Sequence, residues 1–157
     1  MAADRNDDDL RRFVERFALL LTNAGMARMP ARVFACLLAE DSGQLTAGDL
    51  AARLEVSPAA ISGAVRYLAQ VDMVVREREP GARTDHFRLH HDVWAEMYTS
   101  RAAQLRHWEQ AMAEGVAVLG LDRPAGRRLD ETREFFAFLR EELPAVIERW
   151  RERRDRA

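Results

Sequence analysis

Residues 57–89 constrain the fold of this chain more than any other stretch. The stretch opens with Ser57-Pro58, which favours a helix start because serine can cap free amides and proline suits the first helical position. Ile61, Val65 and Leu68 then recur at helical spacing and predict one buried face. The opposite face carries only small or basic side chains, so we expect a helix over 57–71 with a bare outer surface.

A β-hairpin is predicted directly after this helix. Residues 73–78 alternate as a strand does, and a second strand returns from His86 to Leu89. The turn Glu79-Pro80-Gly81-Ala82 between them carries Arg83 at its end. A helix with small outer side chains fits a DNA major groove, and an arginine at a hairpin tip can reach the adjacent minor groove.

A shorter helix is predicted just before residue 57. Thr46-Ala-Gly-Asp49 has the pattern of a capping box that opens a helix ending at Leu54, and Glu55-Val56 forms a turn. Two short helices, a tight turn and a hairpin make a winged helix-turn-helix, a DNA-binding arrangement. The DNA-contacting residues we expect are Thr46, Ser57, Pro58, Ala59, Ser62, Gly63, Arg66, Tyr67 and Arg83.

Longer helices are predicted on both sides of this module. Apolar residues recur at helical spacing over 8–23, with Asp7 to Asp9 at the favourable end of the helix dipole, and Pro30 suits the first turn of a second helix. Two further stripes cover 91–119 and 129–150, joined by a turn at 122–126. Pro144 should kink or break the last helix, and the tail from Arg149 should fray.

The long helices allow two interpretations, an antiparallel hairpin that closes on itself or a dimer interface built with the first helix. We favour a homodimer, because a two-fold protein matches a two-fold operator. The expected organisation is a winged helix-turn-helix domain over 28–90 and a helical dimerisation region over 7–27 and 91–152. The expected fold class is mainly α with a small β-hairpin wing (α+β). The expected interface residues are Phe13, Phe17, Leu119, Phe136, Leu139, Leu143, Ile147 and Trp150.

Composition excludes several classes of protein. The formal net charge of the 157 residues is −2, and residues 43–90 hold six arginines and six carboxylates, so charge alone does not indicate nucleic-acid binding. All 24 basic residues are arginine. A single cysteine and the lack of a long apolar run lead us to expect a cytoplasmic protein without disulfides or membrane spans. No group of residues resembles a catalytic constellation, so we expect no enzyme activity.

The remaining candidate residues have both a functional and a structural interpretation. Cys36 lies among Phe34, Leu37 and Leu38, which favours a buried thiol over a redox sensor. The four histidines lack metal-ligand spacing, so we expect no metal and no other cofactor. Four large side chains either line a ligand pocket or belong to the core, and they are Trp94, Tyr98, Trp108 and Met112.

The order and spacing of these segments resemble the MarR family of bacterial winged-helix transcription regulators, and within it a GbsR-like branch. The resemblance covers nearly the whole chain. It rests on Gly25-Met-Ala-Arg-Met-Pro30-Ala-Arg, on Leu45-Thr-Ala-Gly-Asp-Leu-Ala-Ala-Arg-Leu54, on Val56-Ser57, Ile61-Ser62, Val65 and Leu68, on the segment 76–89, and on Glu141-Glu-Leu-Pro-Ala-Val-Ile-Glu-Arg-Trp150.

This resemblance implies an obligate homodimer that binds an inverted-repeat operator in double-stranded DNA, often as a repressor, and that a small ligand can release. The chain departs from the family at Gly81, where common wings carry an acid, and at Pro58-Ala59, where relatives often carry a basic or polar residue. We therefore expect a sequence-specific repressor. The alternative is a winged-helix module for protein assembly without DNA affinity, which the local charge balance favours.

Overall fold

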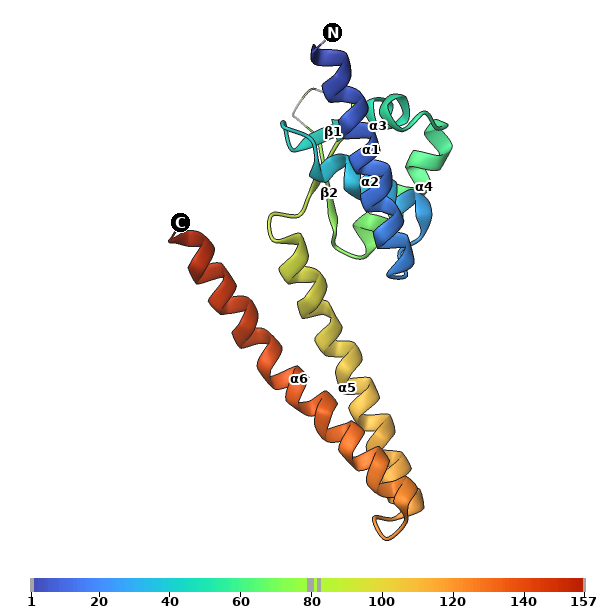
Figure 1. The fold of residues 1–157 in the computed structure, drawn as a ribbon, viewed down its shortest axis with the longest axis vertical. Helices are drawn as coiled ribbons and strands as arrows, with labels where there is room; N and C mark the ends of the chain where they lie inside the picture. The colour runs from blue at the N-terminus through green and yellow to red at the C-terminus, as the bar shows by residue number, and fades with distance from the viewer. Residues whose placement is uncertain (1, 79–80, 82, 157) are drawn as a thin grey trace. The chain divides into compact units, whose positions relative to one another are not determined.

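The computed structural model describes residues 2–78, 81 and 83–156, and the side chains of these residues except 2–6 and 100–103. The described residues form six helices and three strands. The chain divides into two compact units, residues 1–93 and residues 94–157 (Figure 1). The first unit holds the segments predicted to contact DNA, and the second holds the two longest helices.

The first unit begins with two helices that pack on each other. Helix α1 spans Ala2–Asn23 and helix α2 spans Arg28–Leu38. Gly25 turns the chain between them with a φ of +104°, which glycine adopts without steric cost. Because α1 already begins at Ala2, the expected placement of Asp7 to Asp9 at the helix start is wrong. Asp9 instead accepts a hydrogen bond of 2.8 Å from Arg12 on the next turn.

Both helices of the helix-turn-helix begin at side-chain caps, as the sequence predicts. Helix α3 spans Ala47–Leu54, and the Thr46 hydroxyl accepts the Asp49 amide at 3.1 Å while the Asp49 carboxylate accepts the Thr46 amide at 3.0 Å. Helix α4 spans Pro58–Gln70, and the Ser57 hydroxyl accepts the Ala60 amide at 3.3 Å. Between the helices Glu55 has a left-handed φ of 53°, which turns the chain sharply.

The wing is a three-stranded antiparallel sheet rather than the two-stranded hairpin predicted. Strands β2 (Val74–Glu77) and β3 (His86–Leu89) form the expected hairpin. Strand β1 (Gln44–Thr46) pairs with the other edge of β3, so that Leu45 lies opposite Phe87. The predicted turn at Glu79-Pro80-Gly81-Ala82 falls largely on residues outside those described.

The core of the first unit joins all of its elements. Its largest fully buried side chains come from three helices and are Phe34, Leu37, Leu50, Ile61 and Leu68. Leu45 and Phe87 add the sheet to this core, and Val14 and Ala18 add α1. The orientation of α3 and α4 is therefore fixed by close packing, which resists small displacements.

The second unit is an antiparallel helical hairpin. Helix α5 spans Val93–Leu119 and helix α6 spans Pro124–Asp155 (Figure 1). Gly120 has a φ of +74° in the connection, and a Cβ on the buried Gly126 would lie 1.9 Å from the Gly120 carbonyl oxygen. The turn predicted to extend to Gly126 is therefore too long, because α6 has already begun at Pro124. Along the hairpin the rings of Trp108 and Phe136 pack with centroids 5.2 Å apart.

Helix α6 continues through Pro144, so the expected break is wrong. Proline removes the hydrogen bond to the carbonyl of Arg140, but Pro144 is exposed, and a carbonyl on a solvated face can bond to water. The tail also remains helical to Asp155 instead of fraying after Arg149.

Few side chains of the second unit are buried within it. Val118 is 84% exposed and Phe138 is 60% exposed, and Phe135, Val146 and Trp150 are each about half exposed. Although these helices carry much apolar surface, none of the described helices is long and apolar enough to cross a bilayer.

Candidate nucleic-acid interface

Helix α4 separates its buried residues from its outer residues as the sequence predicts. Ile61, Ala64, Val65 and Leu68 are buried against the core. The predicted contact residues Pro58, Ala59, Ser62, Gly63, Arg66 and Tyr67 are all exposed on the other face. A Cβ placed on Gly63 would meet no atom within 4 Å, so nothing in the first unit covers this part of the helix. The outer face of α4 therefore carries mostly short side chains and is uncovered within the first unit, as entry into a major groove requires.

The start of α4 offers backbone donors beside this face. The first amides of a helix lack partners within the helix and carry a partial positive charge. The exposed Ser57 hydroxyl satisfies one of them, the amide of Ala60, and Pro58 has no amide to satisfy. The Ala60 and Ile61 amides also bond to the Ser57 carbonyl, so the Ala59 amide is the first-turn donor left for a phosphate oxygen.

Arg66 is the single charged side chain on this face of α4. Within the described residues its guanidinium makes no hydrogen bond or ion pair, either with Asp72 just after the helix or with any other group. Tyr67 is 41% exposed beside it. An arginine that does not already satisfy a carboxylate keeps all five donors for a phosphate or a guanine edge.

The Thr46 hydroxyl is less available for a DNA contact than the exposed side chains of α4. Its hydroxyl both accepts the Asp49 amide and donates to the Asp49 carboxylate at 2.6 Å. These hydrogen bonds hold the pKa of Asp49 below its usual range, so the cap carries a full negative charge at neutral pH. The Thr46 hydroxyl therefore serves as the cap of α3 in this structure. Its role as a DNA contact stays a prediction.

Paired charges organise the stem of the wing. Asp85 binds both Arg78 and Arg76, with 2.6 Å between Asp85 and the Nε of Arg78, and the hydrogen bonds from these two arginines lower the pKa of Asp85. Across the same strands Arg88 binds Glu77 at 2.5 Å. Residues 43–90 contain equal numbers of arginines and carboxylates, and most of these carboxylates form ion pairs with arginines or cap a helix.

Arg76 on β2 and Arg78 just after it were not among the predicted contact residues. Arg76 and Arg78 keep more than half of their side-chain surface exposed although Asp85 binds them. Their alternation in the sequence, opposite an acid on the returning strand, is the signal that could have found them. Arg83 is exposed in the segment that follows the wing tip, consistent with its predicted role.

The residues expected to line a ligand pocket lie along α5. Trp94, Tyr98 and Trp108 are each between 39% and 45% exposed within the described chain, and Met112 is half-buried. Trp108 also packs on Phe136 within the hairpin, so the pocket and the core interpretations both stay predictions. Cys36 is buried in α2, and burial raises the pKa of its thiol, as the structural interpretation expected. No group of described residues has the arrangement of a metal site.

The residues expected in the dimer interface divide between the two units. Phe13 and Phe17 stack on α1 with centroids 5.9 Å apart, and Phe13 is 39% exposed. In the hairpin the expected residues Leu119, Phe136, Leu139, Leu143 and Ile147 are half-buried, and Trp150 is exposed. Phe135, Phe138 and Val146 are more exposed than most of these and were not predicted.

Two family models match the chain over its two units. A model of the MarR family matches residues 24–83, and a model described as MmpR5-like MarR family transcriptional regulator matches residues 92–153. No curated protein matches the chain.

Solved structures support the same assignment. The crystal structure of a transcriptional regulator is similar to the chain with a TM-score of 0.77 and 26% identity, over 92% of this chain and 99% of the other. The archaeal chromatin protein TrmBL2 is similar with a TM-score of 0.55 and 20% identity, over 68% of this chain and 40% of the other, a likeness of fold alone.

Proposed function

The chain belongs to the MarR family of winged-helix transcriptional regulators, and we propose that it acts as a homodimeric repressor on an inverted-repeat operator. In this proposal α4 lies in the major groove of each half-site, and the wing reaches the adjacent minor groove. Regulators of this family are DNA-binding proteins and not enzymes. The GbsR-like branch and a cytoplasmic location stay predictions.

The observation that carries the DNA proposal is the outer face of α4. Six exposed positions on this helix present small side chains, one tyrosine and one unpaired arginine, while the opposite face is buried. Small side chains allow the helix backbone to approach base edges, and Arg66 supplies a bidentate donor for guanine. In this proposal Ser57, Ser62 and the amide of Ala59 bind phosphates.

The dimer proposal rests on the surface of the second unit. A two-helix hairpin that leaves Phe138, Val118 and Trp150 more than half exposed has apolar surface that another element should cover. A second copy of the same hairpin is the simplest partner, because homodimers are the commonest oligomers and a two-fold dimer matches an inverted repeat.

We also propose that a small ligand releases the protein from DNA, and the support for this is the resemblance to the family. Trp94, Tyr98, Trp108 and Met112 recur along α5 and are at least partly exposed, which is consistent with a pocket that a second element completes.

The alternative is a protein-assembly module without DNA affinity, favoured by the balanced charge of residues 43–90. Binding to random duplex DNA at several salt concentrations separates the two functions. A DNA-binding protein loses affinity steeply as salt rises, because phosphate contacts release counterions. A lack of any salt-dependent binding would favour the assembly module.

Arg66→Ala tests the proposed interface itself. If Arg66 contacts a base, the variant should lose about 1–3 kcal/mol per half-site and lose discrimination at one operator position. If it holds a phosphate, affinity should fall equally for all sequences, with a shallower salt dependence. The measurement compares the operator with a mismatched site at two salt concentrations, and Arg106→Ala on α5 is the control. Unchanged binding by Arg66→Ala would remove α4 from the interface.

A further inference from the structure

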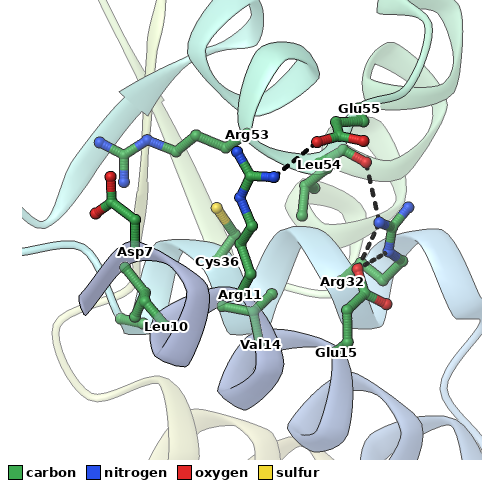
Figure 2. Close-up of a pocket in the computed structure, with 11 residues that line it drawn as sticks. Asp7, Leu10, Arg11, Val14, Glu15, Arg32, Cys36, Arg53, Leu54 and Glu55 are labelled. Carbon is green, nitrogen blue, oxygen red and sulfur yellow. Dashed lines mark hydrogen bonds and ion pairs between the residues drawn. The ribbon is translucent and has the colours of Figure 1, made fainter. Parts of the chain in front are cut away.

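A cavity of about 440 Å³ lies within the first unit, between α1, α2 and the C-terminal end of α3 (Figure 2). This volume falls in the range of small-molecule sites. Leu10, Val14, Ala39 and Leu54 form its apolar walls, and the sulfur of Cys36 faces it from α2. None of the α5 residues expected to line a ligand pocket is among the described residues that line this cavity.

Arginines on three helices face this cavity, and they differ in how firmly they are held. Arg32 is fixed, because it donates to Glu15 at 2.7 and 2.5 Å and to the Leu54 carbonyl at 3.0 Å. Arg53 binds Glu40. Both groups are therefore already engaged with carboxylates or carbonyls of the protein.

Arg11 is held less firmly than the other two arginines. Its guanidinium contacts Glu55 through one nitrogen at 2.8 Å, and both side chains are more than 60% exposed. An exposed pair of this kind contributes little to stability. Arg11 can therefore exchange Glu55 for another carboxylate and bind it through two parallel hydrogen bonds.

The walls define the rest of the ligand. None of the described lining residues is aromatic, so the walls favour an aliphatic body over a stacked ring. Burial raises the pKa of the Cys36 thiol, which keeps that wall neutral. We propose that this cavity binds a small aliphatic or alicyclic carboxylate, with its apolar body against Leu10, Val14 and Leu54 and its carboxylate on Arg11.

Binding at this site would replace one contact of the helix-turn-helix. Glu55 is the left-handed residue between α3 and α4, and its pair with Arg11 joins that turn to α1. A carboxylate ligand on Arg11 would break this connection. An effect of the ligand on operator affinity rests on the proposed function, whereas the binding itself does not.

Calorimetric titration of the full-length, DNA-free protein with cyclohexanecarboxylate tests the site, with cyclohexanecarboxamide as the uncharged control. We expect one bound carboxylate per chain and affinity for the amide lower by about tenfold or more. Arg11→Ala should cause the same loss. Arg16→Ala, which removes an exposed arginine of the same helix outside the cavity, should bind as the unmodified protein does.

Cys36 gives a second readout, because it is the single cysteine of the chain. The carboxylate should slow alkylation of Cys36 by iodoacetamide, and Ala39→Leu, which fills the cavity without changing charge, should abolish both binding and protection. Equal binding of acid and amide, undiminished binding by Arg11→Ala, or no binding at millimolar concentration would overturn the proposal. Because no DNA is present, each of these results leaves the proposed function standing.

Discussion

The two units of the chain bury their apolar residues to very different extents. The first unit encloses Phe34, Leu50, Ile61 and Leu68 completely, with side chains from helices and sheet around them. The second unit has two helices of 27 and 32 residues, yet most of its large apolar side chains remain at least partly exposed. Two helices provide only one contact face each, so a hairpin cannot enclose a core. The first unit therefore has a closed core, and in the proposed dimer a second copy covers the exposed apolar residues of the second unit.

The largest effect should come from the core of the first unit. Phe34→Ala on α2 should lower the free energy of unfolding by about 3–5 kcal/mol, because it leaves a cavity in a closely packed interior. Leu38→Ala on the same helix is the control, since Leu38 is 41% exposed. Urea denaturation measures both variants. Equal losses would contradict the close packing of the first unit's core.

The next effect concerns association through the second unit. Phe138→Asp should convert a dimer of about twice the 17.9 kDa chain mass into monomers in sedimentation at micromolar concentration. An unpaired carboxylate in an apolar interface costs several kcal/mol, whereas the same group on an exposed surface costs little. Glu142→Ala on the same helix should remain dimeric. If the unmodified protein sediments as a monomer, the exposed apolar residues of the second unit do not form a dimer interface.

Arg83→Ala tests the DNA-binding surface of the first unit and leaves its core unchanged. The variant should fold normally and bind the operator more weakly by about 1–3 kcal/mol, because the minor groove attracts a guanidinium. Gel shifts measure the affinity, and circular dichroism checks the fold. Arg106→Ala on the second unit should bind as the unmodified protein does, and an equal loss in both variants would contradict a specific role for the wing.

The smallest effect separates the helix caps of the two units. Thr46→Ala should lower stability by about 1 kcal/mol, because it removes the cap of α3. Arg123→Ala at the start of α6 should change little, since Arg123 makes no capping hydrogen bond through its side chain. The measurement is the free energy of unfolding in urea, and a comparable loss in Arg123→Ala would contradict the difference.

The same cap should give a dependence on pH. The Thr46 hydrogen bonds lower the pKa of Asp49 in the folded state. Its contribution to stability is therefore complete above the ordinary aspartate pKa and is lost as pH falls through the lowered value. Asp49→Asn should show a shallower loss of stability over that acidic range, and an unaltered profile would contradict the role of the cap.

Local signals allowed the helix-turn-helix to be predicted from the sequence. The caps at Thr46 and Ser57 involve residues three positions apart, so a short segment contains the whole interaction. The strand β1 could not be found in this way. Its three residues pair with β3, about forty positions later, and nothing in Gln44-Leu45-Thr46 specifies that partner.

Other features depend on competition between interactions. Pro144 disfavours a helix locally, but the helical segments on both sides and access to water outweigh one missing hydrogen bond. The cavity beside Arg11 also escaped sequence analysis, because residues from α1, α2 and α3 meet there only after folding. Periodicity predicts which face of a helix is buried, but not which side chains from different helices converge.

The position of Thr46 limits which changes of operator length the protein can accept. It ends β1, it caps α3, and it lies opposite His86 of the wing, so the sheet and the helix-turn-helix share one residue. The wing therefore has no joint by which it could shift along DNA relative to α4. One base pair inserted inside a half-site would displace the wing's target by about 3.4 Å along the duplex. An operator with such an insertion should therefore bind the protein more weakly, because α4 and the wing could not both reach their targets in that half-site.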